Sequence, residues 1–238
     1  MKRIRHSRRS SSFSLLEAIV VAGTSGVLIA VLLPALAASK KKARHVSCAN
    51  SLKQIAISSW AWSEEHNGKY PMQVSVNDGG AMELVGSGAA YPHFRVLSNE
   101  LNTPRILVCP GDTMAMKEMG KVMAARALAR GTNRGYSPPF LPTNFPVSYF
   151  VGVDAQSDRP KMFLSGDANL AVAGQPAKPG LLSLWTDSPV AWAKPLRAYH
   201  GEGGNILTVD GSVHQVGDMS LRKLLQETGV ATNRLAMP

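Results

Sequence analysis

The feature that most constrains this chain is an uncharged apolar run near its amino terminus, Ala18–Ala38, which reads AIVVAGTSGVLIAVLLPALAA. A helix rises about 1.5 Å per residue, so these 21 residues are enough to cross the hydrocarbon core of a bilayer. Basic clusters flank the run on both sides, and their members are Lys2, Arg3, Arg5, Arg8, Arg9, Lys40, Lys41, Lys42 and Arg44. This arrangement predicts a membrane-spanning helix.

The positive charge of the chain is concentrated beside this run. The 238 residues include 26 Lys and Arg against 16 Asp and Glu, a net charge of +10. Without the nine flanking bases, residues 45–238 carry 17 bases and 15 acids and are nearly neutral. No basic stripe with interleaved aromatic residues occurs in that part. We therefore interpret the charge as membrane topology, with the first cluster in the cytoplasm, and expect no nucleic-acid partner.

Three interpretations of the amino terminus compete. A secretory signal peptide would be cleaved after the small residues at 35–37, and a plain membrane anchor would keep the apolar run. Neither explains Glu17, a carboxylate at the edge of the run, which would cost on the order of 3 kcal/mol at the centre of a membrane and less near its surface. The third interpretation gives Glu17 a charged partner.

Ser12, Phe13 and Glu17, followed by the apolar run and Pro34, resemble the prepilin-type cleavage and methylation segment of type IV pilins and type II secretion pseudopilins. The resemblance implies that a prepilin peptidase cuts between Ser12 and Phe13, that the new amino terminus at Phe13 is methylated, and that Pro34 bends the helix. Glu17 would then pair with the terminal ammonium of a neighbouring subunit, as a carboxylate in an apolar setting requires. Ser12 departs from the family, which has Gly there.

The chain is expected to have four parts: a basic leader at 1–12, a transmembrane and assembly helix at 13–38, an amphipathic extension at 39–67, and a globular domain at 68–238. Apolar residues recur every three or four positions between Val46 and Trp60, and Gly68 is suited to end the helix in a left-handed conformation. The fold class expected is α+β and pilin-like, with this long helix packed on a small antiparallel sheet.

Shorter patterns indicate the elements of the domain. We expect strands at 105–109, 147–153 and 181–185, a helix at 113–130 capped by Thr113, a loop at 131–146, and an exposed insertion at 154–180. A hairpin is expected over Ile206–Val216, with Asp210 and Gly211 forming a two-residue type I′ turn.

A second resemblance covers residues 46–216. His200, Asp210 and Gly211 match the H-x9-DG signature of a large pseudopilin-like family, which also carries the segments found here around Cys48 and Cys109. Both cysteines would face an oxidising compartment. A disulfide between them would close a loop of about 60 residues and stabilise the fold by roughly 4 kcal/mol, while two isolated thiols are the alternative.

Two constellations could carry chemistry. His200, Asp210 and His214 could act as metal ligands or as an acid–base set, but we favour a structural role in which Asp210 serves the turn. Asp154, Asp158 and Asp167 offer the oxygen ligands that calcium prefers, without a ligand spacing. We expect no enzyme activity, metal or cofactor.

The expected function is that of a structural subunit of a type IV pilus or a type II secretion pseudopilus. Its partners would be other pilin or pseudopilin subunits, a prepilin peptidase and an assembly platform, and its location the bacterial inner membrane, with the domain in the periplasm or on a surface filament. The alternative is a membrane-anchored envelope domain that binds carbohydrate or another surface ligand through Trp185, Trp192 and Tyr199.

Overall fold

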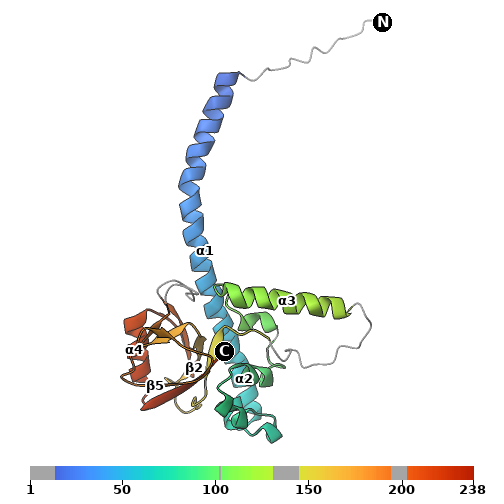
Figure 1. The fold of residues 1–238 in the computed structure, drawn as a ribbon, viewed down its shortest axis with the longest axis vertical. Helices are drawn as coiled ribbons and strands as arrows, with labels where there is room; N and C mark the ends of the chain where they lie inside the picture. The colour runs from blue at the N-terminus through green and yellow to red at the C-terminus, as the bar shows by residue number, and fades with distance from the viewer. Residues whose placement is uncertain (1–13, 102, 131–144, 194–202) are drawn as a thin grey trace. The chain divides into compact units, whose positions relative to one another are not determined.

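The structure is a computed structural model that describes residues 14–101, 103–130, 145–193 and 203–238 (Figure 1). The helices are α1 (Leu15–Glu65), α2 (Tyr91–Val96), α3 (Thr113–Arg130) and α4 (Asp218–Glu227), and the 3₁₀ helices are η1 (Pro71–Gln73), η2 (Val76–Asp78), η3 (Met82–Ser87) and η4 (Pro104–Leu107). The strands are β1 (Tyr149–Gly152), β2 (Phe163–Asp167), β3 (Leu170–Val172), β4 (Gln175–Pro176), β5 (Gly180–Trp185), β6 (Val190–Trp192), β7 (Gly204–Thr208), β8 (Val213–Val216) and β9 (Thr232–Met237).

The chain divides into two compact units, one up to Lys42 and the other from Ala43 to Pro238. The described part of the first unit is the helical segment Leu15–Lys42, which contains Pro34. The second unit contains the rest of α1 together with the sheets and the other helices. The residues expected to extend the membrane helix therefore belong largely to the globular unit.

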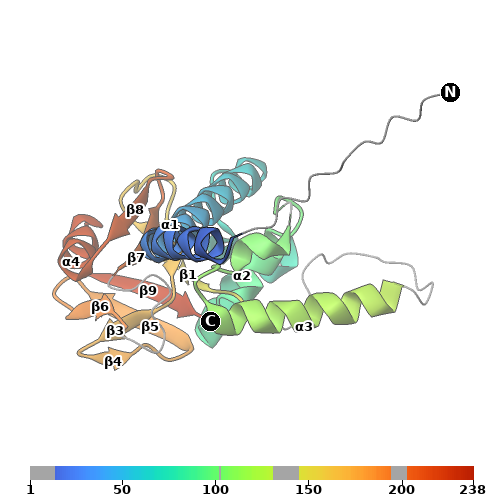
Figure 2. The same ribbon diagram turned by 90° about the horizontal axis from the view of Figure 1, so that it is seen from above.

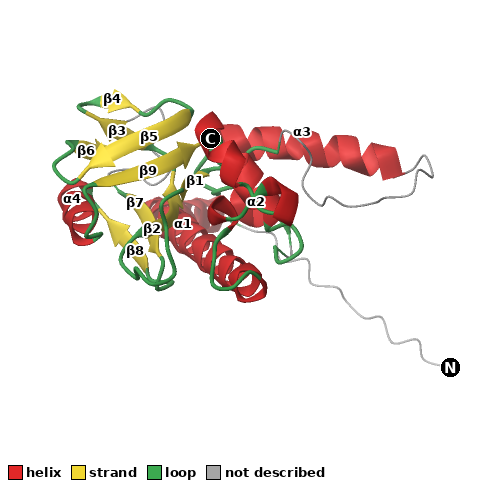
Figure 3. Ribbon diagram, turned by 90° about the horizontal axis from the view of Figure 1, so that it is seen from below, coloured by secondary structure: helices red, strands yellow, loops and turns green. Residues whose placement is uncertain are grey.

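The second unit is built on antiparallel sheets (Figure 2). The larger sheet has the strand order β5-β9-β1-β2-β7-β8, and the smaller sheet has the order β4-β3-β6. Every paired strand runs antiparallel to its neighbour. Figure 3 shows these strands beside the helices. The expected α+β class with an antiparallel sheet is confirmed, and β1 and β5 lie where strands were expected.

The larger sheet is covered on both faces, because alternate residues of its central strands enter two separate apolar clusters. The first cluster joins the sheet to α1 through Leu52, Ile55, Tyr149, Val151, Leu164 and Leu207. The second cluster joins it to α4 and the smaller sheet through Phe150, Phe163, Ile206, Trp192, Leu221 and Leu225. Strands buried on both faces have continuous apolar sequences, which explains why β1 and β7 show little alternation.

Two of the expected elements are wrong. Residues 105–109 were expected as a strand, but Pro104–Leu107 is the 3₁₀ helix η4, whose first turn is favoured by Pro104 and by the Thr103 hydroxyl accepting from the Arg105 amide at 3.4 Å. Residues 154–180 were expected as an exposed insertion, yet they contain β2, β3 and β4. The β2 residues Phe163 and Leu164 are buried in the centre of the sheet.

The helix expected at 113–130 is confirmed as α3, but its cap is different. The Asp112 carboxylate, rather than Thr113, accepts a hydrogen bond from the Ala115 amide at 3.0 Å. This places Asp112 at the N-cap position. At the end of α1, Gly68 has the expected left-handed conformation with φ of 76°, and its amide donates to the Ser63 carbonyl at 2.8 Å.

The hairpin β7–β8 is confirmed, but its turn is not of type I′. The Gly211 amide donates to the Thr208 carbonyl, and the Thr208 amide donates to the Ser212 carbonyl at 3.0 Å. These bonds define a three-residue loop in which a type I turn is followed by Gly211 in a left-handed conformation, with φ of 75°. The loop is one residue longer than expected because Val209 is part of it.

Candidate functional site

The first unit presents apolar side chains on all sides of its helix. Its large apolar residues are each more than half exposed, and they are Leu15, Leu16, Ile19, Val20, Val21, Val27, Leu28, Ile29, Val31, Leu32, Leu33 and Leu36. Among the described residues, α1 is one helix that by length and composition could cross a membrane. A helix that is apolar all round is stable only when lipid or other helices cover it.

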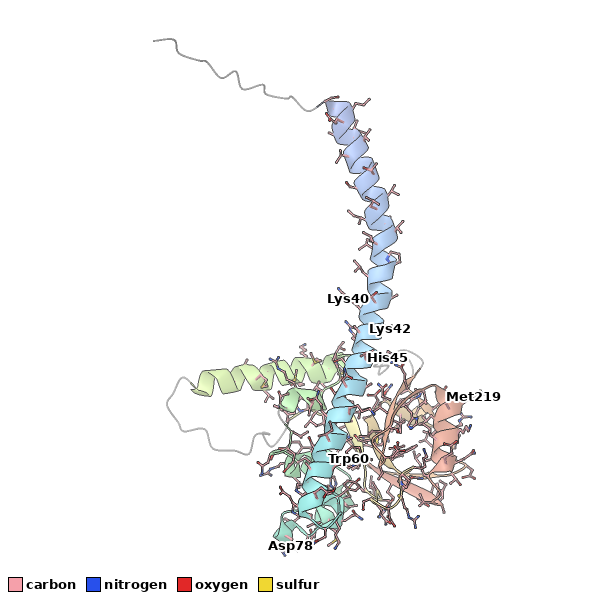
Figure 4. The ribbon with its side chains drawn as sticks, turned by 180° about the vertical axis from the view of Figure 1, so that it is seen from behind. Lys40, Lys42, His45, Trp60, Asp78 and Met219 are labelled. Carbon is pink, nitrogen blue, oxygen red and sulfur yellow. A yellow bond between two sulfur atoms is a disulfide. The ribbon has the colours of Figure 1, made fainter. Side chains whose placement is uncertain are left out.

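The residues that the motif singles out in this segment lie at its two ends. Glu17 is exposed in the first turn of α1, where the helix dipole favours a negative charge. Pro34 lies inside the helix near the end of the apolar run. Lys40 and Lys42 follow it along α1 and are exposed (Figure 4). Ser12 and Phe13, the expected cleavage and methylation residues, lie outside the described residues.

In the second unit, α1 is joined to the domain by a covalent bond. Cys48 on α1 and Cys109 form a disulfide, with their Cα atoms 5.3 Å apart and both residues fully buried. A disulfide and two isolated thiols were the alternatives left open above, and the structure contains the disulfide. The bond connects the beginning of the globular part of α1 with the segment that leads into α3.

A second attachment holds α1 against the β7–β8 loop. The Lys53 ammonium donates to the Gly211 carbonyl at 2.7 Å, and the Trp60 indole N–H donates to the Val209 carbonyl at 3.2 Å. A Cβ atom built on Gly211 would overlap the Trp60 ring. Gly211 is therefore needed both for its left-handed backbone and for the close approach of the indole. Trp60 lies on α1 (Figure 4) and remains 39% exposed, so it is only partly a core residue.

Asp210 holds the same loop in shape. Its carboxylate accepts hydrogen bonds from the Thr208 hydroxyl at 2.6 Å and the Ser212 amide at 2.9 Å, and Lys161 lies 3.6 Å away. Partial burial raises the pKa of Asp210, but these hydrogen bonds and the lysine charge outweigh it and lower the pKa to about 2. The structure thus places Asp210 and Gly211 of the motif in one loop that docks on α1.

The three residues considered for acid–base or metal chemistry are only partly brought together. The His214 Nε2 atom lies 3.4 Å from the Thr208 hydroxyl, which also contacts Asp210. His200 lies outside the described residues. Because Asp210 is occupied by the bonds of its own turn, this geometry fits the structural role that we favoured for it.

The three aspartates considered for calcium do not share a site. Asp154 accepts hydrogen bonds from the Arg234 guanidinium and amide, whereas Asp167 is fully buried. Over residues 14–101, 103–130, 145–193 and 203–238, neither Asp154 nor Asp158 belongs to a group of three metal-binding side chains. The group that does occur there consists of Asp167 and the two bonded cysteines, whose sulfur atoms are joined to each other.

The aromatic residues expected for a carbohydrate-binding surface are also separated. Trp185 on β5 is 59% exposed, but Trp192 is only 2% exposed and packs in the second apolar cluster. The expectation that Trp192 is a surface ligand platform is wrong, because β6 turns its ring into the core. Tyr199 lies outside the described residues.

Sequence reasoning missed His93 altogether and did not predict that Asp167 is buried. His93 on α2 is 2% exposed and lines a cavity of about 20 Å³ with Ile55, Ser59 and Tyr70. Among the described residues, neither of its ring nitrogens has a hydrogen-bond partner, and burial lowers the pKa of His93 to about 4. Asp167, considered above for calcium, is the last residue of β2 and is fully buried. No spacing or motif predicts the burial of either side chain, since each is a single polar residue in an otherwise ordinary segment.

Comparisons of this chain with protein-family models, with curated proteins and with solved structures give no match.

Proposed function

We propose that this chain is a prepilin-like structural subunit that is inserted in the inner membrane, cut before Phe13, and assembled into a type IV pilus or a type II secretion pseudopilus. The observation that carries the proposal is the apolar helix, exposed all round, with the single acid Glu17 in its first turn. Such a helix can be stored in lipid and later buried against copies of itself. A repeated head-to-tail contact of this kind produces an open filament.

Glu17 gives the assembly a register. Cleavage before Phe13 creates an ammonium four residues from Glu17, so the charges of two neighbouring subunits can pair when their helices are staggered. Two unpaired charges in an apolar filament core would cost several kcal/mol, which disfavours any other stagger. The partners proposed are other pilin or pseudopilin subunits, a prepilin peptidase and an assembly platform in the inner membrane.

The attachments of α1 to the domain suit this role. An assembly helix that moves out of a membrane must carry its domain with it. The Cys48–Cys109 disulfide is covalent, and the hydrogen bonds of Lys53 and Trp60 to the β7–β8 loop hold α1 at points five and twelve residues further along. Force on the helix would therefore reach the sheet through two separate connections.

Electron microscopy of material sheared from cells tests assembly. We expect filaments that bind an antibody against the domain, and we expect Glu17→Ala cells to lack them while still containing the subunit in their membranes. The exposed Trp185 favours the alternative, a membrane-anchored domain that binds a surface carbohydrate. Absence of filaments together with retention of the chain on a glycan column, lost in Trp185→Ala, would support that alternative and contradict assembly.

A further inference from the structure

A buried carboxylate lies beside the disulfide. An oxygen of Asp167 and the sulfur atoms of Cys48 and Cys109 all lie within 4.8 Å of one another, and the three residues are fully buried. One Asp167 oxygen accepts hydrogen bonds from the Asn205 amide at 2.7 Å and from its side-chain Nδ2 at 2.9 Å. Placing a carboxylate in an apolar core costs free energy, so its position next to two sulfur atoms calls for a reason.

Disulfide formation needs a proton acceptor. The thiolate, not the thiol, attacks a disulfide, so one of the two cysteines must lose its proton before the bond closes. Closure brings both sulfur atoms into the core, where they are fully buried, so a neighbouring side chain is better placed than bulk water or buffer to take that proton. Asp167 has a suitable affinity for the proton, because burial raises its pKa to about 7. The charge of Asp112 also raises this pKa, whereas the hydrogen bonds from Asn205 lower it.

The surroundings of the sulfur atoms indicate which of them attacks. The Gly111 amide donates to the Cys109 sulfur at 3.3 Å. A hydrogen bond from a backbone N–H favours a thiolate at Cys109. Cys48 lies in the interior of α1, away from either end of that helix.

We propose that Asp167 is the proton acceptor that closes the Cys48–Cys109 disulfide. Before the segment around Cys109 packs against α1, Cys48 forms a mixed disulfide with a small disulfide oxidant such as glutathione disulfide. The proton of the Cys109 thiol passes to the Asp167 carboxylate, and the thiolate attacks the Cys48 sulfur. The bond from Cys48 to the oxidant breaks, the glutathione thiolate leaves with the electron pair, and Asp167 later releases its proton. Two cysteine thiols are oxidised and one glutathione disulfide is reduced to two thiols.

A test must distinguish the effect of Asp167 from the effects of the other titratable groups near it. Asp112 is 9% exposed and bonds to the Ser148 hydroxyl at 2.9 Å, and Tyr149 on β1 is the cross-strand neighbour of Asp167. Asp112 provides a matched control, since it is also a carboxylate close to Cys109 in the sequence but does not belong to the group formed by Asp167 and the two sulfur atoms.

The test follows closure of the bond in the full chain. The protein is reduced in detergent micelles, mixed with glutathione disulfide between pH 5.5 and 8.5, and quenched with an alkylating reagent, so that mass spectrometry separates the mixed disulfide from the closed bond. We expect the closure rate of the wild type to level off above about pH 7. In Asp167→Asn, closure at pH 7 slows on the order of 100-fold and keeps rising with pH, because hydroxide or buffer must then remove the thiol proton. Asp112→Asn keeps fast closure and a plateau, but the plateau begins at a lower pH, because the charge of Asp112 contributes to the raised pKa of Asp167.

Three results would overturn the proposal. Two concern the variants: Asp167→Asn closing at the wild-type rate with the wild-type pH profile, and Asp112→Asn losing the fast closure step. The other needs no variant and holds even when Asp167→Asn does not fold: a wild-type closure rate that keeps rising tenfold per pH unit from 6 to 8 has no acceptor titrating near 7.

Discussion

Protonation of His93 should make the stability of the domain depend on pH in a defined direction. The imidazole is 2% exposed, and neither ring nitrogen has a hydrogen-bond partner in the part of the chain that the structure describes. Burial lowers its pKa from 6.5 to about 4. The folded chain therefore keeps His93 neutral below pH 6.5, whereas the unfolded chain takes up a proton there. Stability from this residue is complete above pH 6.5 and declines as the pH falls toward 4.

The size of the effect follows from the same two values. A pKa difference of this size corresponds to about 3 kcal/mol, lost at about 1.4 kcal/mol per pH unit across the window from 6.5 to 4. Asp167 acts in the opposite direction, because burial raises its pKa from 3.8 to about 7 and the folded chain binds its proton first. The two contributions nearly cancel between pH 4 and 6.5, so together His93 and Asp167 should add little pH dependence to the stability of the wild type there.

Removing His93 should expose the contribution of Asp167. We expect His93→Leu to become more stable in acid than at neutral pH, so that its free energy of unfolding relative to the wild type shifts by about 3 kcal/mol between pH 7.5 and 4. Urea unfolding of the full chain in detergent, followed by tryptophan fluorescence, measures this difference. Phe94→Leu removes packing at the same cavity without a titrating group and should keep the wild-type slope. A difference between His93→Leu and the wild type that is constant with pH would refute the reasoning.

Three further predictions concern the attachments of α1 and its first turn. Gly211→Ala should destabilise the domain by about 3 kcal/mol in urea unfolding, because the new methyl group overlaps Trp60 in addition to straining the backbone. Gly174 is also left-handed but lies in open space, so Gly174→Ala should cost about 1 kcal/mol. Equal losses in the two variants would show that the contact between Gly211 and Trp60 does not hold the loop on α1. Replacing both cysteines by serine should lower stability by about 4 kcal/mol, and an unchanged urea midpoint would show that the bond is dispensable. Glu17→Ala should reach the membrane in normal amounts but leave sheared fractions without the subunit, and normal filament yield would exclude a register role.

The sequence predicted the parts of the fold that depend on local patterns. The apolar run, the end of α1 at Gly68 and the β7–β8 hairpin are set by residues close to one another in the chain. Phe163 and Leu164 were placed in an exposed insertion because neither their burial nor their pairing with β1 and β7 follows from the residues beside them. Pro104 determined a 3₁₀ turn in a segment whose apolar content is equally typical of a strand.

The same division applies to the candidate site. Glu17 and Pro34 were identified by spacing, and Asp210 and Gly211 by a turn motif. The hydrogen bonds of that turn with Trp60 and Lys53 join residues about 150 positions apart, and no pattern along the chain connects them. The burial of His93 likewise depends on how α1, α2 and the sheet meet, which only the folded structure contains.

Mass spectrometry of the mature amino terminus tests the central claim most directly. The chain should be isolated from envelope fractions of cells that contain a prepilin peptidase, and its amino-terminal peptide sequenced. A prepilin-like subunit should begin at Phe13 and carry one methyl group on the terminal nitrogen, with an intact Met1 start in cells that lack the peptidase. A start at Ala38, or an intact Met1 in cells with the peptidase, would contradict the proposed function.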